Sequence, residues 1–357
     1  MKYINKVIRL IRKMILCMRP YNGFRNRKIF KSFSGFQRDF YIKYWAEASS
    51  AIGASLDDVG YGCFKITKGN KKTYVRNFNV MLDDNLTLNI AGNKPFVLNI
   101  LKEHNFQIPK FLEYKLQDII KAQAFLESLG KSAVVKPASG TGAGRGVTTH
   151  INDITKLHKA SNFASSYCET LLIEEQVEGD SFRLLYIEGE FIDALRRDPP
   201  IVIGDGQSTI KQLIRQENNK RINSDEILTF HPLIIDMECK LKLKEQGLTI
   251  KSVLDRNQKI IVKTVVNQNS CFENHVVRDT VHPSLILTGQ KIVNELGITL
   301  GGIDVITTDI SIPLQESGGI INEINTTPGL HHHSLVFEKD KILPVGEMVL
   351  NYIFSNK

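Results

Sequence analysis

Hydrophobic and polar residues alternate along the chain with two different periods from residue 93 onward. Short apolar runs bounded by turn residues predict strands, and they read "SAVVKP", "TLLIEEQV", "GGIDVITTDI" and "GGIINEIN". The run "FRLLYIEGEFIDALRR" predicts a hairpin that turns at Glu188 and Gly189. Helical spacing covers "NKPFVLNILKEHNFQIP" up to Pro109, a helix capped by Ser208 or Thr209, and the C-terminal segment. These elements predict a mixed α/β (α+β) protein.

Residues 39 to 92 have a different pattern, with a helix around Trp45 followed by the short alternating stretches "YGCFKI" and "KTYVRNFNVML". We therefore expect a small N-terminal α/β domain at 39–92, which precedes a larger core at 93–357. The chain of 357 residues, 42% hydrophobic, is long enough for such a division.

The first 38 residues form a basic arm, because they contain eleven Lys or Arg and no Asp or Glu. The other 35 basic residues are balanced by 38 acidic ones, so the net charge of +8 belongs to the arm and no nucleic-acid partner is expected. Apolar and basic residues lie on opposite faces of a predicted helix: Ile4, Val7, Ile8, Ile11, Ile15 and Met18 against Lys2, Lys6, Arg9 and Lys13.

Three interpretations of the arm remain open. A basic amphipathic helix within residues 1–31 could lie on an anionic membrane surface. The helix could instead pack on its own domain or on a partner subunit, and an acid-free, Arg-rich start also resembles a transit peptide. No apolar run approaches the ~20 residues that cross a bilayer. The five cysteines are scattered and lack CxxC spacing, which predicts neither disulfides nor a zinc site and favours a cytoplasmic location.

The segment "AVVKPASGTGAGRGV" ends a predicted strand with Lys136 and continues into a glycine-rich loop. It satisfies neither the Walker A motif nor GxGxxG. Gly140, Gly142, Gly144 and Gly146 leave backbone amides bare enough to wrap around phosphate oxygens, with Lys136 adding a charge at the base. A structural hairpin tip is the alternative interpretation.

Acidic and amide side chains occur on two predicted strands near the C-terminus. Glu323 and Asn325 are two residues apart in "INEIN", so both point to one face of a strand. Asp304, in "GGIDVI", would lie beside them if the two strands pair. Two carboxylates and an amide oxygen are ligands suited to Mg²⁺, and an unpaired acid among apolar neighbours would be costly. The alternative is a solvated polar face.

These motifs occur in a fixed order: the lysine-ended strand with its glycine loop, "LLIEEQVEG", "GIDV" and "INEINTTPGL". In this order they resemble the ATP-grasp superfamily of carboxylate–amine ligases. "LRRDPPIVIGDGQSTIKQLI" and "TTDISIPLQESGGIINEINTTPG" are similar to the ATP-grasp part of cyanophycin synthetase, and the resemblance covers roughly residues 56–357. "PGLHHHSLV" is closer to D-alanine:D-alanine ligases. The resemblance implies an ATP-grasp fold, in which two α+β subdomains clasp ATP, with a lid subdomain at about 129–176.

The resemblance also implies roles for the residues at matching positions. ATP and Mg²⁺ would be the cofactors, and Asp304, Glu323 and Asn325 would be the metal ligands. The nucleotide-binding set would comprise Lys94, Lys136, Gly140, Gly142, Gly144, Gly146, Glu174, Glu175, Val177 and Asp180. Arg197, Arg183 and Lys136 would be catalytic, with the arginines facing the transferred phosphoryl group or the substrate carboxylate.

Several positions depart from the pattern of the resembling proteins. Leu98 replaces a cation expected four residues after Lys94, and Ser181 stands where a ribose-binding acid is expected, with Asp180 one place early. The loop "NQNSCFENH" differs from its counterpart near the acceptor, so a different substrate is expected. His331, His332 and His333 are consecutive and cannot easily converge on one ion, which favours a substrate-facing loop over a metal site.

The sequence thus predicts a cytoplasmic, ATP- and Mg²⁺-dependent ligase that forms an amide or peptide bond on an amino acid or peptide through an acyl phosphate. One alternative is a ligase that modifies a larger peptide or a cell-surface precursor, gathered at the membrane by the arm. The other is a nucleotide-binding regulatory protein that has lost turnover, which the changes at Leu98 and Ser181 would explain. A homo-oligomer is left open.

Overall fold

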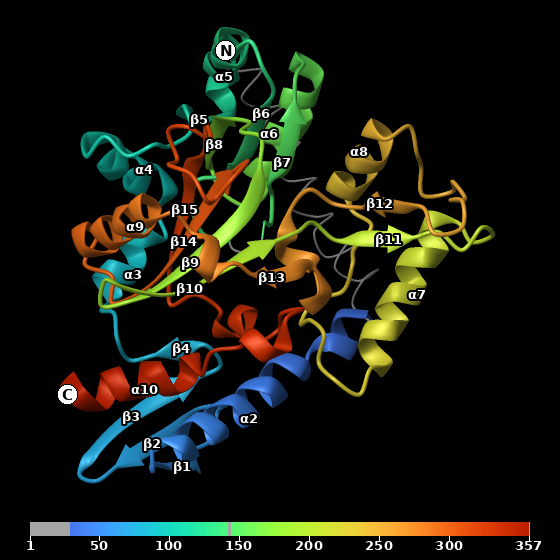
Figure 1. The fold of residues 1–357 in the computed structure, drawn as a ribbon. Helices are drawn as coiled ribbons and strands as arrows, with labels where there is room; N and C mark the ends of the chain where they lie inside the picture. Colours follow the sequence, from blue (N-terminus) through green and yellow to red (C-terminus); the bar gives the residue numbers. More distant parts are fainter. Residues whose placement is uncertain (1–28, 142–143, 357) are drawn as a thin grey trace.

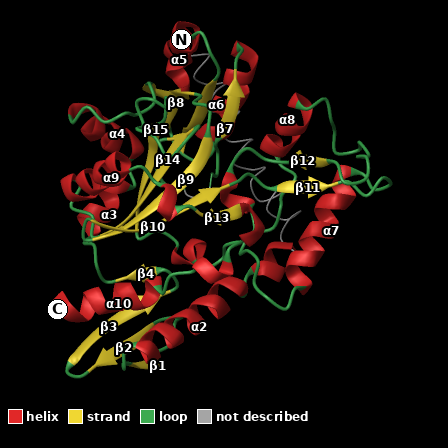
Figure 2. Ribbon diagram, in the orientation of Figure 1, coloured by secondary structure: helices red, strands yellow, loops and turns green. Residues whose placement is uncertain are grey.

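The computed structural model describes residues 29–141 and 144–356. Within these residues the strands form four sheets, and the paired strands are antiparallel. Figures 1 and 2 show the sheets with helices packed around them, so the predicted mixed α/β composition is confirmed. Most of the predicted basic arm, residues 1–28, lies outside the described residues, as does Gly142. No helix of the described part is long and apolar enough to span a bilayer.

A five-stranded sheet forms the centre of the core, in the order β13 (Asn274–Val276), β10 (Glu190–Arg197), β9 (Asp180–Ile187), β14 (Leu300–Thr307), β15 (Ile320–Thr326). One face is apolar along its length, as Phe182, Leu184 and Tyr186 of β9 illustrate. Helices α3 (Asn85–Ala91), α4 (Lys94–Glu103) and α9 (Pro283–Glu295) cover this face (Figure 1). Burying these side chains supplies the main hydrophobic stabilisation of the core.

The opposite face of the same sheet is divided into an apolar half and a charged half. Leu185, Ile187 and Leu300 pack on the N-terminal unit, which consists of α2 (Phe36–Ala51) and the sheet β1 (Ser55–Asp58), β2 (Phe64–Lys68), β3 (Lys71–Arg76), β4 (Asn79–Val80). The C-terminal helix α10 (Val345–Asn356) joins this cluster (Figure 1). The apolar cluster therefore crosses the predicted division between 39–92 and 93–357, which stays a prediction.

A second antiparallel sheet lies above the central sheet in the view of Figure 1. Its strand order is β5 (Phe111–Lys115), β8 (Thr170–Glu175), β6 (Ala133–Pro137), β7 (Thr148–Ile151). Helices α5 (Ile119–Leu129) and α6 (Ile154–Ser165) pack against it. The sheet thus extends before residue 129, and the limits of a lid subdomain remain a prediction. The glycine loop connects β6 to β7, and residues 176–179 connect β8 to β9 of the central sheet.

A further unit, between β10 and β13, was not separated from the core by the sequence pattern. It contains β11 (Ile201–Ile203), β12 (Lys259–Ile261), α7 (Ile210–Asn223) and α8 (Met237–Glu245), and it has an apolar cluster of its own. The sequence showed the capped helix α7 but not the pairing of β11 with β12, because these two strands are short and far apart in the chain.

A hairpin turn, a helix cap and a helix end were predicted from local sequence. The hairpin turns at Glu188 and Gly189, with φ of 50° and 77°, as predicted. Thr209, not Ser208, is the N-cap of α7, and it forms a capping box with Gln212. The helix predicted up to Pro109 was wrong in its end, because α4 stops at Glu103. Asn105 adopts a left-handed φ of 57° just beyond it, a conformation that terminates helices.

Candidate functional site

The acidic and amide side chains near the C-terminus meet on the charged half of the central sheet. Strands β14 and β15 are neighbours, with Asp304 directly opposite Glu323 and Gly302 opposite Asn325. The Asn325 Nδ2 amide donates to Asp304 Oδ2 at 3.3 Å. The predicted strand pairing is therefore confirmed, and three oxygen-bearing side chains lie together. Their role as metal ligands stays a prediction.

Basic residues accompany both carboxylates. Arg183 on β9 donates from Nε and Nη2 to the two oxygens of Asp304, at 2.6 and 2.7 Å, and both residues are buried. Burial opposes the Arg183 cation, but the Asp304 carboxylate prevails and the pKa of Arg183 is raised. Lys94 Nζ lies 3.1 Å from Glu323 Oε1, which links α4 to the same site. Leu98, one turn beyond Lys94, is buried and lines a small pocket with Lys94 and Glu323, so no cation stands at that position.

Arg197 differs from its basic neighbours because it forms no ion pair within the described part of the chain. It ends β10, is 6% exposed, and its Nε has no hydrogen-bond partner among the described residues. Burial lowers its pKa to about 9, and the nearby Arg183 cation acts in the same direction. Asp304 and Glu323 are close enough to oppose this shift. The result is a buried cation that lacks an anion of its own.

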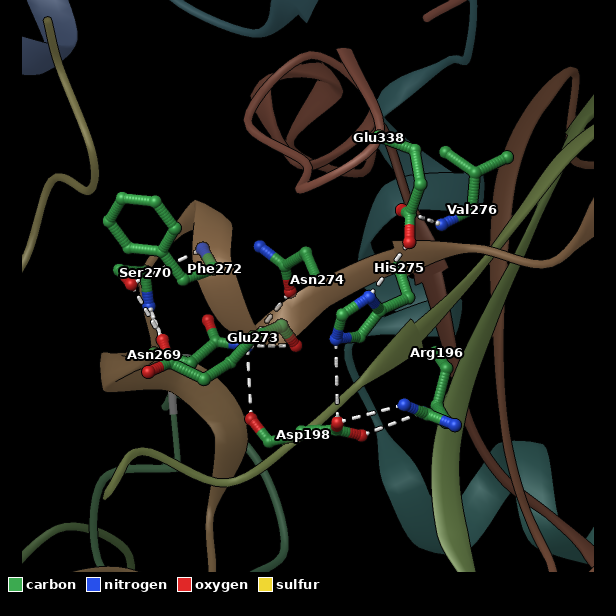
Figure 3. Close-up of polar contacts among 10 residues, drawn as sticks. All are labelled: Arg196, Asp198, Asn269, Ser270, Phe272, Glu273, Asn274, His275, Val276 and Glu338. Atoms are coloured by element: carbon green, nitrogen blue, oxygen red, sulfur yellow. Dashed lines mark hydrogen bonds and ion pairs between the residues drawn. The ribbon is translucent and has the colours of Figure 1, made fainter. Parts of the chain in front are cut away.

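The adjoining residue Arg196 points to the other side of the sheet. It pairs with Asp198 through two hydrogen bonds of 2.9 and 3.1 Å, as Figure 3 shows. Asn269, from the loop in which the sequence departs from the resembling proteins, donates from Nδ2 to Asn274 Oδ1 at 2.8 Å and to the Asp198 carbonyl at 3.2 Å (Figure 3). Because Asn274 pairs with Arg197 in the sheet, this loop fixes the end of β10. No local pattern in the sequence indicated this support, because it depends on pairing between distant segments.

Lys136 and Glu174 form a buried pair beneath the glycine loop. They lie on the adjacent strands β6 and β8, and Lys136 Nζ is 2.7 Å from Glu174 Oε2. Burial raises the pKa of Glu174, Lys136 opposes this, and Glu323 adds to it, so the pair is electrostatically coupled to the acidic site. The other Glu174 oxygen, Oε1, is buried with no hydrogen-bond partner among the described residues.

The last residue of β8 and the residues that follow it line a cavity of about 520 Å³. Its wall includes Glu175, Gln176, Val177 and Glu178, together with Lys131, Ser132, Thr308, Ser317, Gly318 and Ile320. The Glu175 carboxylate is already engaged, with Lys131 Nζ at 2.7 Å and the Lys110 N–H at 2.8 Å, so it differs from its neighbour Glu174. Asp180 is exposed at the start of β9.

The described glycines of the loop adopt conformations that side chains disfavour. Gly140, Gly144 and Gly146 have φ of 71°, 67° and 83°. At Gly146 a Cβ would also lie 2.7 Å from Pro137 Cγ, so the loop folds back tightly over the end of β6. The Lys94 N–H donates to the Ala138 carbonyl at 3.2 Å, which joins the start of α4 to the base of the loop.

The three histidines of η5 (Leu330–His333) do not converge on one point. His333 is buried and its Nδ1 lies 2.8 Å from Asp193 Oδ2, whereas His331 contacts Tyr41 of α2 and the ring of Phe230. His331 and His332 both lie within electrostatic reach of Arg197 and Arg183. The sequence motifs did not indicate Tyr41 or Phe230 as site residues, because neither belongs to a motif.

The acidic site offers oxygen atoms of the kind that a divalent cation binds. No group of three or more His, Cys, Asp or Glu that could hold a metal occurs in the described ranges. Asp304, Glu323 and Asn325 combine two carboxylates with one amide oxygen, which are hard oxygen donors of the kind that bind Mg²⁺ together with water and phosphate. The residues therefore fit Mg²⁺ bound jointly with a phosphate ligand.

Sequence comparison shows that the chain is similar to two kinds of biosynthetic protein. No protein-family model matches the sequence. The chain is 28% identical over 272 residues to the cyanophycin synthetase of Crocosphaera subtropica, covering 74% of this chain and 31% of that protein. It is 26% identical over 358 residues to the glutathione biosynthesis bifunctional protein of Clostridium perfringens, covering 99% of this chain and 45% of that protein. The chain thus spans less than half the length of these relatives.

Among solved structures, the bifunctional glutathione synthetase from Pasteurella multocida matches with a TM-score of 0.54 and 21% identity. The match covers 85% of this chain and 42% of that one, and it shows a shared fold.

Proposed function

Because the chain belongs to the ATP-grasp superfamily, we propose that it is an ATP- and Mg²⁺-dependent ligase that joins a carboxylate to an amine. The carboxylate oxygen attacks the γ-phosphorus of ATP, which yields an acyl phosphate and ADP. The amine then attacks the acyl carbon, phosphate leaves, and the ammonium proton is released as the amide forms. Such a reaction demands chiefly positioning and neutralisation of charge.

The described residues support this proposal as three groups. Asp304, Glu323 and Asn325 would hold Mg²⁺, which when bound neutralises phosphate charge. Lys136 and the glycine loop would contact nucleotide phosphates, and Glu174 Oε1 offers a buried acceptor to the adenine amino group. The Val177 backbone, at the wall of the 520 Å³ cavity, would lie beside the same base. Glu175 and Asp180 stay weaker candidates, since one is engaged and the other is exposed.

The observation that carries the proposal is the buried, unpaired cation of Arg197. A buried charge normally has a partner, because desolvation is costly. Arg197 has none in the described part, yet it adjoins Arg183, Asp304 and Glu323. An anion that arrives with the substrate, either the carboxylate or the acyl phosphate made from it, would complete this site.

The substrates proposed are an amino acid or peptide and an amine. The named relatives make cyanophycin and take part in glutathione biosynthesis. The loop with Asn269, Cys271 and Phe272 departs from the cyanophycin synthetase pattern, and here it supports the strand end that carries Arg197. We therefore propose a different acceptor from that of cyanophycin synthetase. Modification of a larger peptide or a cell-surface precursor falls within the same proposal.

The proposal is tested by ADP release in a screen of amino acids and dipeptides as carboxylate and amine pairs. We expect release that requires both partners together with Mg²⁺, and mass spectrometry should find an amide product. ATP binding by calorimetry with no release for any pair would instead support the regulatory alternative that Leu98 and Ser181 suggested.

A membrane role for the arm is a separate proposal that rests on the sequence alone. Deletion of residues 1–31 is expected to abolish co-sedimentation with phosphatidylserine vesicles and to leave ADP release unchanged. The deletion removes ten of the eleven basic residues that fall within 1–38. Vesicle binding that survives the deletion would remove the membrane interpretation. A cytoplasmic location and homo-oligomer formation likewise stay proposals.

A further inference from the structure

A hydroxyl from the N-terminal unit reaches the histidine segment beside Arg197. Tyr41 on α2 is 1% exposed, and its Oη accepts the His331 backbone N–H at 3.1 Å. The same Oη lies 3.0 Å from His331 Nδ1. These residues are 290 positions apart in the sequence, so the contact is produced by the fold alone.

The two contacts determine which ring nitrogen of His331 carries a proton. The Tyr41 oxygen already accepts a backbone N–H, and among the described residues His331 Nδ1 is the only acceptor in contact with the Tyr41 hydroxyl. A buried donor without an acceptor is costly, so the Tyr41 O–H donates to Nδ1. Nδ1 is therefore unprotonated, and a neutral His331 ring carries its hydrogen on Nε2.

The surroundings of the ring keep it neutral. Its centroid lies 4.3 Å from the Phe230 ring and 4.0 Å from the His332 ring. Burial lowers the pKa of His331 well below its usual range, and the nearby His231, Arg197 and Arg183 act in the same direction. His331 as a whole residue is half-buried, and its Nε2, unlike that of His333, is not among the fully buried side-chain atoms that lack a hydrogen-bond partner in the described part of the chain.

We propose that His331 is a fixed N–H donor that binds a carboxylate oxygen of the substrate beside Arg197, and that Tyr41 is the positioning residue that sets its tautomer. A neutral ring with its hydrogen on Nε2 has no lone pair on that edge for an ammonium group. His331 is thus suited to an oxygen and unsuited to act as the base for the attacking amine. The inference rests on the proposed function and extends the active site to α2.

The tautomer is tested on the full chain without any substrate. Nitrogen-15 NMR of histidine-labelled protein reports the protonation of each ring nitrogen, and His331→Gln assigns the signal. We expect the Nε2–H tautomer in the wild type and a mixture of tautomers in Tyr41→Phe. Tyr44→Phe is the matched control, because Tyr44 also lies on α2 and packs on the Tyr41 ring, but its ring end lies against Gly346. A wild-type Nδ1–H or doubly protonated ring, or a Tyr41→Phe spectrum equal to the wild type, would overturn the proposal.

Carboxylate binding is tested with sodium acetate as the probe. Acetate is expected to shift the His331 Nε2–H signal in the wild type, whereas sodium chloride at equal ionic strength should not. Equal shifts with both salts would contradict the binding role.

If the ligase screen succeeds, Tyr41→Phe should raise the KM of the carboxylate-bearing substrate about tenfold and leave the KM of ATP unchanged. The NMR result does not depend on turnover, so failure of this inference is distinguishable from failure of the ligase proposal.

Discussion

Glu323→Gln is expected to lower kcat by at least about 10²-fold while the protein remains folded. Glu323 lies opposite Asp304 on the neighbouring strand, and the substitution removes one of the two carboxylates of the proposed Mg²⁺ site. The side chain keeps its shape, so the strand pairing should persist. The measurement is ADP release as a function of Mg²⁺ concentration, together with calorimetric ATP binding with and without Mg²⁺.

Glu316→Gln is the matched control, because Glu316 precedes the same strand and is exposed. This control makes the same change of charge and should leave both the rate and the Mg²⁺ dependence as in the wild type. If Glu323→Gln keeps the wild-type rate and the wild-type Mg²⁺ dependence, Glu323 is not a metal ligand. If the Glu323→Gln rate falls while its melting temperature equals that of the wild type, loss of structure does not explain the lower rate.

The acidic site could be predicted from the sequence because it depends on local periodicity and on one strand pairing. Glu323 and Asn325 share a face by the period of two, and Asp304 joins them once β14 and β15 pair. The hairpin at Glu188 and the cap at Thr209 follow from equally local rules. A shared strand face, a hairpin turn and a helix cap are each determined by a few residues that are close together in the sequence.

Other parts of the site depend on the order of strands, which the sequence pattern did not supply. Lys136 and Glu174 meet because β8 lies between β5 and β6. Tyr41 reaches His331 because the N-terminal unit packs on the apolar half of the central sheet. In the sequence, Tyr41 occupies an apolar position of a helix like its neighbours, so the local pattern does not distinguish it from residues that only pack in the core. Tertiary packing decides these contacts, and propensity does not.

Arg197→Gln is expected to lower kcat/KM by about 10³-fold, and Arg197→Lys by about 10²-fold. Lysine retains the charge but cannot form the planar pair of hydrogen bonds that a guanidinium gives to two oxygens of a carboxylate or phosphoryl group. Arg196→Gln is the matched control, since the adjacent residue turns to the other side and pairs with Asp198 (Figure 3). Equal losses in the Arg196 and Arg197 variants would show that the effect is not specific to the face of the sheet that carries Arg183 and Asp304.

The stability of the same variants should change in the opposite sense. Burial lowers the pKa of Arg197 to about 9, well below that of an arginine in the unfolded chain, so at neutral pH the residue is charged in both states and the folded state bears the cost of burying the cation. This cost is present below about pH 9 and declines as the pH rises towards the unfolded value. Arg197→Gln removes it, so the melting temperature at pH 7 should stay equal or rise while activity falls. A lower melting temperature would mean that Arg197 stabilises the folded chain, which is the opposite of what a buried cation without a partner should do.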